Sequence, residues 1–377
     1  MVRFGKKAAV VTAAGVLAAM SATGCSSSLN PDAVVATVGD EDISLGVANF
    51  YTRLTQGEYE TYYASMMGTT AEDMWPQEVD EQGTTMEEQL KDNIMQSLQN
   101  MYLMSQHASD YDIALTDEEE QAISDAADQF VADNTEEVRN TVSGNKEDVQ
   151  KVLELVTIQS RMTEAMQEGV DEEVSDEEAA QKSMDYVLFS YTTTDDSGNS
   201  TEMTDEEKEN IAATAQEFAN QVKTGTDMAD AAEADGVEVQ TATFDSESTT
   251  PDADLIAAAD ALENEGDVTD PVETDSGIYV ARLTSLLDRD ATDTEKETIV
   301  EQRRQDQYNS LLEEWRDAAE IDVNERNWNK IDFTYQGITI VTPEEETSEE
   351  TSTDNTDDSG SAEGSGTSED SGTDGAE

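Results

Sequence analysis

The apolar residues of this chain follow a helical period over one long stretch and a different period afterwards. Between residues 44 and 175 they recur every three or four positions, which places them on one face of a helix. Three successive faces are formed by Met86, Leu90, Ile94, Leu98, Met101 and Tyr102, then Ile123, Ala127, Phe130 and Val131, then Val149, Val152, Leu153, Val156 and Met162. We therefore predict a helical region over 44–175. A short strand should precede it in "AVVATVGDEDIS", with Gly39 and Asp40 as a candidate turn.

The period changes after residue 180. Three β-rich runs, "MDYVLFSYT" from 184, "EVQTATF" from 238 and "GIYVARL" from 277, alternate with helical patterns at 205–222, 228–236 and 255–262. This order predicts a compact domain of roughly 110 residues in which helices and strands are mixed. A long helix over 293–319 and a terminal strand in "KIDFTYQGITIV" should follow. The predicted fold class is α+β.

Four copies of one local signal mark expected helix starts. A hydroxyl residue followed three positions later by Glu occurs in "TDEE" at 116, "SDEE" at 175, "TDEE" at 204 and "TDTE" at 292. In a capping box the hydroxyl accepts from the backbone of the third helical residue, whose carboxylate reaches back. We predict a helix start at each of the four.

The N-terminal residues predict export. Arg3, Lys6 and Lys7 precede the uncharged run 8–20, and small residues lead to Cys25, the only cysteine of the chain. This junction resembles the lipobox of bacterial lipoproteins, in which the cysteine is lipidated and becomes the first residue. The resemblance implies a lipid anchor at Cys25 on the outer face of the cell membrane. The alternative is an ordinary signal with an incidental cysteine, and Ala22 departs from the leucine usual at the first lipobox position.

The composition of the chain excludes some classes of binding partner. From 343 to 377 the chain has no Lys, Arg or aromatic residue, which predicts a disordered acidic tail, although a partner-binding role for it stays open. The net charge is −68, from 88 acidic and 20 basic residues. Nucleic acids and anionic lipid surfaces are bound through basic patches, so neither is an expected partner. We expect no cofactor and no metal site.

Several stretches together resemble the extracytoplasmic foldase lipoproteins of Gram-positive bacteria, which are related to the SurA-type periplasmic chaperones. They are "VVATVGDEDIS", "VSDEEAAQKSMDYVLFS", "NQVKTGTDMADAAEADG" and "ALENEGDVTDPVETDSGIYVARL". The resemblance covers about residues 30 to 325. It implies a helical chaperone domain built from both chain ends, with an inserted parvulin-type peptidyl-prolyl isomerase domain.

The resemblance sets the expected domain boundaries. They are 1–24 for the lipoprotein signal peptide, 25–32 for a linker, 33–180 for the helical chaperone domain, 181–290 for the parvulin-like domain, 291–342 for a helix and strand that pack on the chaperone domain, and 343–377 for the tail.

The family's catalytic pattern is incomplete in this chain. Parvulins carry a histidine in the first strand and another in the last, and Tyr186 and Tyr279 stand there. Asp260 stands where the family has an aromatic residue of the proline pocket, to which we also assign Phe244 and Leu262. The single histidine, His107, belongs to the helical region.

These departures predict weak or absent isomerase activity. Twisting an X-Pro bond opposes a barrier of about 20 kcal/mol, so an isomerase must bind the twisted amide better than either planar form. Tyrosine can donate a hydrogen bond, but its pKa of about 10 prevents the titration that histidine shows near neutrality. If Asp260 faced the proline slot, desolvating its charge would cost several kcal/mol.

A polypeptide-binding surface is then the main candidate for function. The stretch 59–75 contains Tyr59, Tyr62, Tyr63, Met66, Met67, Met74 and Trp75, and flexible thioethers suit promiscuous apolar binding. Met86 and Met101 have helical spacing and are expected in the core, whereas 59–75 is equally compatible with a groove or with the core.

Three functions remain open from the sequence. The first is a membrane-anchored chaperone or foldase for unfolded or newly exported polypeptides. The second is an active isomerase that uses Tyr186 and Tyr279, and the third is a surface lipoprotein that binds a ligand or adheres. The oligomeric state is left open.

Overall fold

The computed structural model describes residues 19–24, 29–66, 68–194, 200–333 and 336–341. It divides into two compact units, the first from 1–107, 114–159 and 320–377 and the second from 108–113 and 160–319. Helices and strands are mixed in both, which confirms the α+β class. Cys25 and the tail 343–377 lie outside the described residues. None of the described helices is both long and apolar enough to cross a membrane.

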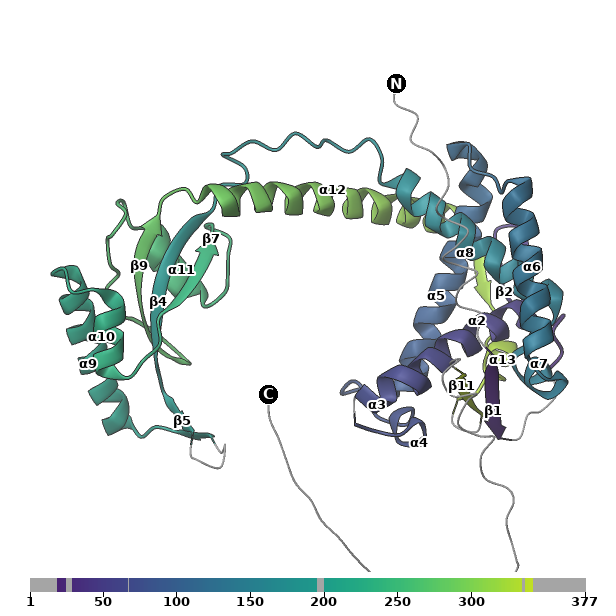
Figure 1. Cartoon of the computed structure of the whole chain (residues 1–377), viewed down its shortest axis with the longest axis horizontal. Helices are drawn as coiled ribbons and strands as arrows, with labels where there is room; N and C mark the ends of the chain where they lie inside the picture. Colours follow the sequence, from purple (N-terminus) through teal and green to yellow (C-terminus); the bar gives the residue numbers. More distant parts are fainter. Residues whose placement is uncertain (1–18, 25–28, 67, 195–199, 334–335, 342–377) are drawn as a thin grey trace, which may run out of the picture. The chain divides into compact units, whose positions relative to one another are not determined.

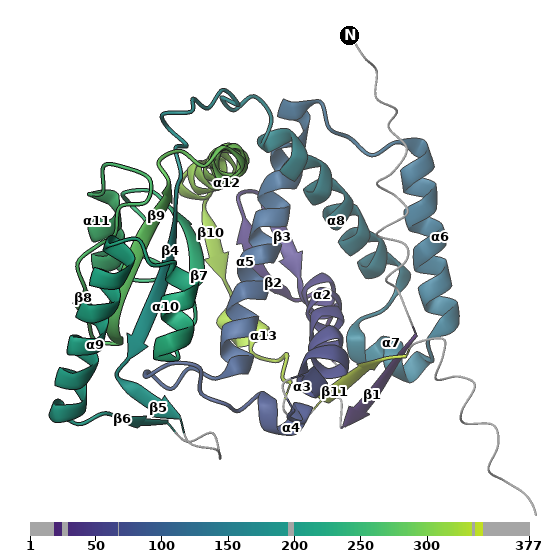
Figure 2. The ribbon, with the colours of Figure 1, turned by 60° about the vertical axis from the view of Figure 1, so that its left-hand side comes forward.

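The first unit joins both ends of the chain (Figures 1 and 2). Its strands are β1 (Met20–Gly24), β2 (Val34–Val38), β3 (Glu41–Ser44), β10 (Ile321–Val323) and β11 (Gln336–Ile340). They form an antiparallel sheet in the order β10-β2-β3 and an antiparallel pair β1-β11. The predicted turn at Gly39 is present, with φ +58. N-terminal strands therefore pair with C-terminal strands at two places.

Helices make up the rest of this unit. They are α2 (Leu45–Glu58), the π-helix η1 (Tyr59–Tyr63), α3 (Ala64–Met66), α4 (Ala71–Met74), α5 (Met86–His107), α6 (Asp117–Asp133), α7 (Glu136–Val142), α8 (Lys146–Met166), which continues into the second unit, and α13 (Glu325–Trp328). Helix α6 begins with the predicted capping box of Thr116 and Glu119.

The second unit contains a four-stranded antiparallel sheet in the order β7-β4-β9-β8. Its strands are β4 (Lys182–Ser190), β7 (Gln240–Phe244), β8 (Val272–Thr274) and β9 (Gly277–Ser285), and β5 (Thr192–Thr194) and β6 (Ser200–Glu202) form a separate hairpin. Its helices are the 3-10 helix η2 (Ala108–Tyr111), α9 (Asp205–Lys223), α10 (Met228–Asp235), α11 (Ala253–Asp260) and α12 (Arg289–Ala318). Helices α9 and α10 cover one face of the sheet and α11 covers the other (Figure 1).

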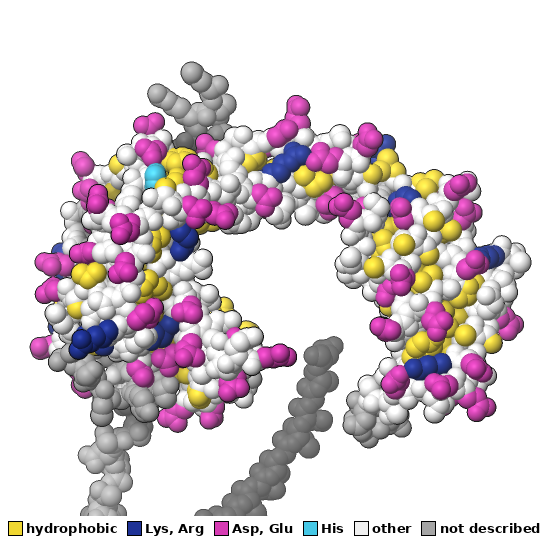
Figure 3. Space-filling view, turned by 180° about the vertical axis from the view of Figure 1, so that it is seen from behind, with side chains coloured by type: hydrophobic (Ala, Val, Ile, Leu, Met, Phe, Trp, Pro, Cys, Tyr) yellow, Lys and Arg dark blue, Asp and Glu magenta, His cyan; other side chains and the backbone are white. Residues whose placement is uncertain are grey.

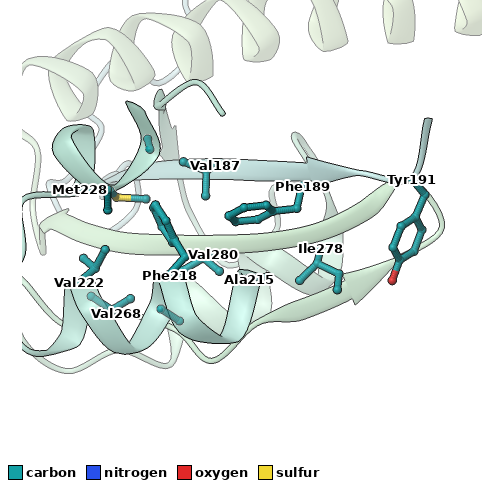
Figure 4. Packing of buried hydrophobic residues seen from close by; sticks show 13 residues of the cluster. Val187, Phe189, Tyr191, Ala215, Phe218, Val222, Met228, Val268, Ile278 and Val280 are labelled. Atoms are coloured by element: carbon teal, nitrogen blue, oxygen red, sulfur yellow. The ribbon is translucent and has the colours of Figure 1, made fainter. Parts of the chain in front are cut away.

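Alternation along the strands assigns residues to the two faces. Val187 and Phe189 of β4 point toward α9, where Phe189 meets Phe218 edge to face with ring centroids 5.4 Å apart (Figure 4). Their neighbours Met184 and Tyr186 point to the α11 face. The sheet is therefore apolar on both sides, which matches the nearly continuous apolar run from 184.

Two of the four predicted helix starts are wrong. At Ser175 the hydroxyl accepts from the backbone of Glu178 at 3.1 Å, but only turns follow. The acidic residues there pair with α12 instead, Asp176 with Arg289 at 2.5 Å and Glu178 with Arg303 at 2.6 Å. The local signal is present, but the segment follows an irregular path in which its acidic side chains pair with α12.

The start at Thr292 is displaced by one turn. Asp288 caps α12 by accepting from the backbone of Ala291 at 3.0 Å, so the helix begins at Arg289. Thr292 is completely buried inside the helix, where its hydroxyl accepts from the backbone of Gln181 at 3.1 Å. The start at Thr204 is confirmed by its capping box with Glu207.

A row of buried polar side chains on α2 holds the first unit together. Arg53 is 4% exposed and donates to Asn49 at 3.2 Å, to the side chain of Gln56 and to the carbonyl of Asp332 at 2.9 Å. Asn49 donates in turn to the carbonyl of Thr141 at 2.9 Å. Burial lowers the pKa of Arg53 to about 10, so the guanidinium stays charged at neutral pH. The row thus connects α2 to α7 and to the C-terminal segment.

The same row fixes β11. Glu60 accepts from the backbone of Ile338 at 2.7 Å and from Trp75 Nε1 at 2.8 Å, and Gln56 donates to the carbonyl of Gln336 at 2.6 Å. Ile338 is completely buried and faces Gly57, where a Cβ would lie 3.1 Å from its methyl group. One edge of β11 is therefore satisfied by side chains of α2 and η1.

Replacing Glu60 with Gln should destabilise the protein by about 1–3 kcal/mol, because an NH2 group would face a donor in place of a carboxylate oxygen. Burial raises the pKa of Glu60 above its ordinary value of 4.5. The folded state then holds this proton to higher pH than the unfolded chain, so the ionisation of Glu60 lowers the free energy of unfolding as the pH rises.

The stability advantage of the wild type over Glu60→Gln should therefore shrink as the pH rises above 4.5 and become constant above the folded-state pKa. Urea unfolding followed by tryptophan fluorescence at several pH values measures this difference. Glu81→Gln, at an exposed carboxylate, serves as control. An advantage that grew with pH would contradict the assignment.

Candidate functional site

The α11 face of the second unit brings together most of the residues that the sequence singled out. Tyr186, Tyr279 and Phe244 belong to one buried cluster, and Leu262 packs against it. The other buried members are Met184, Leu255, Ile256, Ala259, Ala281 and Leu283. The face is thus an apolar layer between the sheet and α11, with two tyrosines in it.

The two tyrosines are diagonal neighbours on adjacent strands. Tyr279 of β9 is opposite Leu188 of β4, two residues from Tyr186 on the same face. Their ring centroids are 6.0 Å apart and the rings are inclined by 51°. Tyr186 is 8% exposed and Tyr279 is 6% exposed.

Tyr186 has a partner that the sequence did not suggest. Its hydroxyl donates to Gln240 Oε1 at 2.6 Å, and Gln240 is directly opposite it on β7. The pair follows from the register in which β4 and β7 run antiparallel, with Tyr186 opposite Gln240. The sequence alone does not determine that register, so it did not indicate the pair. The hydroxyl of Tyr186 is therefore already used within the sheet.

The hydroxyl of Tyr279, unlike that of Tyr186, is not used in a hydrogen bond within the sheet. Among the described residues it has no hydrogen-bond partner. Burial, followed by the charge of Asp252 and by Tyr186, raises the pKa of Tyr279. The phenol is therefore protonated at neutral pH and can only donate or accept a hydrogen bond; it cannot exchange protons with a substrate as an imidazole does.

Asp260 is not left unpaired. Lys182 Nζ lies 3.0 Å from Asp260 Oδ1 and donates to the Asp260 carbonyl at 2.8 Å. Both side chains are partly exposed, so the pair contributes little stability. Its effect is to place a charged pair, where the parvulin resemblance implies an aromatic side chain, beside the apolar layer.

Phe244 and Leu262 differ in accessibility. Phe244, at the end of β7, has no exposed surface because its side chain packs on the α11 face of the sheet. A bound peptide could touch it only after neighbouring side chains moved. Leu262, just after α11, is partly buried. Of the five site residues predicted in this domain, Tyr279 is the one that combines a place in the layer with a polar group that has no hydrogen-bond partner among the described residues.

A second candidate surface lies in the first unit. Tyr62, Tyr63 and Met66 are 52%, 46% and 75% exposed, and we call these three residues the apolar ridge. Tyr63 stacks on Tyr59 with ring centroids 4.9 Å apart.

Of the two alternatives left open for 59–75, the core holds for its last part, because Met74 and Trp75 are 0% and 1% exposed. Met67 lies outside the described residues. Met101 is completely buried, as predicted, and Met86 is half-buried.

Comparison with known families identifies one domain. Residues 193–298 match the family model of the PPIC-type PPIase domain, so this part of the chain is similar to that family. The matched stretch includes Tyr279, Phe244 and Asp260 and begins after Tyr186. No curated protein matches the chain in sequence.

Foldases and chaperones are among the solved structures that are similar to this chain. Foldase protein PrsA from Streptococcus pneumoniae is 22% identical over 67% of this chain and 96% of its own, with a TM-score of 0.28. PrsA from Bacillus anthracis is 18% identical over 58% of this chain and 95% of its own, with a TM-score of 0.25. One of two related SurA-like chaperones of Campylobacter jejuni is 11% identical over 78% of this chain and 99% of its own, with a TM-score of 0.26.

The two tyrosines should respond differently to loss of the hydroxyl. Tyr186→Phe removes the bond to Gln240 and should lower the opening free energy of β4 and β7 by about 0.5–1 kcal/mol. Tyr279→Phe removes a hydroxyl without a partner and should change it by less than about 0.5 kcal/mol. Hydrogen exchange measured by mass spectrometry on peptides from 182–190 and 240–244 tests both variants. A larger cost for Tyr279→Phe would show that its hydroxyl is bonded within the domain.

Proposed function

We propose that this protein is a membrane-anchored extracytoplasmic chaperone for exported polypeptides, and that its PPIC-type domain has weak or no isomerase activity. The observation that carries the second part is the tyrosine pair on the α11 face. By the family resemblance Tyr186 and Tyr279 stand at the histidine positions, and their rings are neighbours while Tyr186 is bonded to Gln240.

The chemistry of the reaction supports this view. Stabilising a twisted amide requires an apolar slot for the proline ring and donors oriented toward the carbonyl or the nitrogen. On the α11 face only the Tyr279 hydroxyl is a free donor among the residues assigned to the site, and the Lys182–Asp260 pair puts charge beside the layer. A proline ring that displaced water from this pair would meet a desolvation cost of several kcal/mol.

Anchoring is proposed from the sequence of the export signal. After cleavage before Cys25 and lipidation, acyl chains would contribute about 0.8 kcal/mol per buried CH2 to membrane binding. The protein would then be held on the outer face of the cell membrane, where newly exported polypeptides emerge unfolded.

The apolar ridge is the proposed client surface. Exposed Tyr62, Tyr63 and Met66 combine aromatic area with a flexible thioether, which suits many different apolar sequences. Acidic side chains are spread over the face shown in Figure 3, where basic ones are few, and such a surface opposes binding of nucleic acid. A polypeptide with apolar segments fits this chemistry better than a polyanion.

A working isomerase is the second candidate, because the free hydroxyl of Tyr279 could donate to a substrate carbonyl. Protease-coupled isomerisation of a panel of X-Pro peptides separates the two. We expect the mature wild type to stay within about twofold of the uncatalysed rate, since burial raises the pKa of Tyr279 and its phenol exchanges no proton near neutrality. Turnover that Tyr279→Phe or Tyr186→Phe reduced would instead establish an active site that uses these tyrosines.

Chaperone function should depend on the apolar ridge. The triple variant Tyr62→Ser, Tyr63→Ser, Met66→Ser should need about tenfold more protein for half-suppression of aggregation of a denatured client, because three exposed contacts are lost. The control is the double variant Val79→Ser, Leu286→Ser, which removes other exposed apolar side chains. Equal activity of the triple variant and the control would contradict the assignment. If the wild-type protein does not suppress aggregation of the client, the favoured function becomes a surface lipoprotein that binds a ligand or adheres.

A further inference from the structure

Strand β1 is made of residues that the sequence assigns to the export signal. It comprises Met20–Gly24, directly before Cys25, and it pairs along its whole length with β11, from Met20 opposite Ile340 to Gly24 opposite Gln336 (Figure 2). If the signal is cleaved before Cys25, as proposed above, the mature protein lacks β1. We call the space that β1 fills the strand slot.

The strand slot is built to hold an extended backbone. Met20 N donates to Asn134 Oδ1 at 2.8 Å, Gln336 Nε2 donates to the carbonyl of Thr23 at 3.0 Å, and the backbone of Val341 donates to the carbonyl of Ala19 at 2.8 Å. Asn134 and Gln336 are both 6% exposed. Removal of β1 leaves these three groups without the partners they have here, so a new strand in the slot could restore all three hydrogen bonds.

The slot should keep its shape when β1 is gone. The opposite edge of β11 is bonded to the first unit through Glu60, which accepts from Ile338, and Thr61, which accepts from the backbone of Ile340 at 2.9 Å. Ile338 and Ile340 are 0% and 7% exposed against α2. Because β11 is held without β1, its other edge remains a template for a new strand.

Residues 20–24 also show what chemistry the slot accepts. They are uncharged, with one flexible apolar side chain, Met20, which is 6% exposed, followed by small residues. At Gly337 a Cβ would lie 2.7 Å from Thr23 Oγ1, so this glycine makes room for a short side chain on the bound strand. Most contacts use the backbone of the strand, which makes recognition tolerant of sequence.

We propose that in the mature protein the strand slot binds an extended, uncharged, small-residue segment of an unfolded client by strand addition to β11. The proposal rests on the chaperone function and on cleavage before Cys25. The apolar ridge supports this occupant, because η1, which carries Tyr62 and Tyr63, also supplies Glu60 and Thr61 to the opposite edge of β11. In the uncleaved precursor the chain's own residues fill the slot, so removal of the signal opens it.

The test compares two forms of the chain, both with Cys25→Ser. One begins at Ala19 and contains every described residue, and the other begins at residue 25. The probe is the peptide Ala-Met-Ser-Ala-Thr-Gly, which has the sequence of 19–24, with a fluorescent label, and binding is measured by anisotropy. We expect the shorter form to bind at least about tenfold more tightly than the longer one. A peptide with Pro in place of its serine should not bind, because it cannot donate in the ladder.

A substitution in the slot gives a second readout. Gly337→Val should weaken binding of the original peptide, and the loss should be smaller for a peptide with Gly in place of its threonine, because the clash at that position is relieved. Circular dichroism of the variant checks that it folds. A loss that is equal for both peptides would overturn the assignment of Gly337 to the slot.

The remaining outcomes separate this inference from the proposed function. If the shorter form suppresses client aggregation but does not bind the peptide, or if both forms bind it equally, the strand slot is not a client site and the chaperone proposal stands. If the shorter form dimerises through β11, a second copy is the occupant and the proposal is overturned. If the shorter form binds the peptide but does not suppress aggregation, the slot exists and the chaperone proposal fails.

Discussion

Arg53 imposes the constraint on which the first unit depends. A guanidinium that is 4% exposed must have hydrogen-bond acceptors around it, and here they come from Asn49 and Gln56 on its own helix and from the carbonyl of Asp332 near the C-terminus. Removing one partner of such a buried charge is far more costly than a surface change. Sequence segments almost 280 residues apart are therefore held together by the requirement to solvate one cation.

This requirement also determines which surfaces are left for function. Because Gln56 and Glu60 extend the row to β11, that strand is fixed along one edge, and its other edge is left to whatever strand is present. The apolar ridge continues from the same helical segment. In the second unit helices cover both faces of the sheet. The ring of Tyr186 contacts that of Tyr279, and its hydroxyl donates to Gln240 within the sheet. The first unit therefore has a strand edge and exposed apolar side chains that an unfolded polypeptide could contact, whereas the sheet of the second unit is covered on both faces.

Much of the local structure could be predicted from the sequence, because its causes are local. Thr116 and Thr204 start helices as their capping boxes indicate, and the β-rich run from 184 forms strand β4. Ser175 has the same signal but no helix follows, and the ion pairs of Asp176 and Glu178 with α12 are long-range contacts that the local signal does not reveal. The pairing of β1 with β11 and the ion pair of Asp260 with Lys182 depend equally on tertiary contacts. The family resemblance located the tyrosine pair, but it did not reveal Gln240.

The most direct test of the account is to map where an unfolded client touches the mature chain. A denatured client carrying photoreactive groups would be cross-linked to the wild type under conditions of aggregation suppression, and the linked peptides identified by mass spectrometry. We expect the cross-links to be concentrated at 59–66 and 336–341 in the first unit. Cross-links concentrated around Tyr279 and Leu262 in the PPIC-type domain would contradict it, since the client would then be held at the face that we consider catalytically weak.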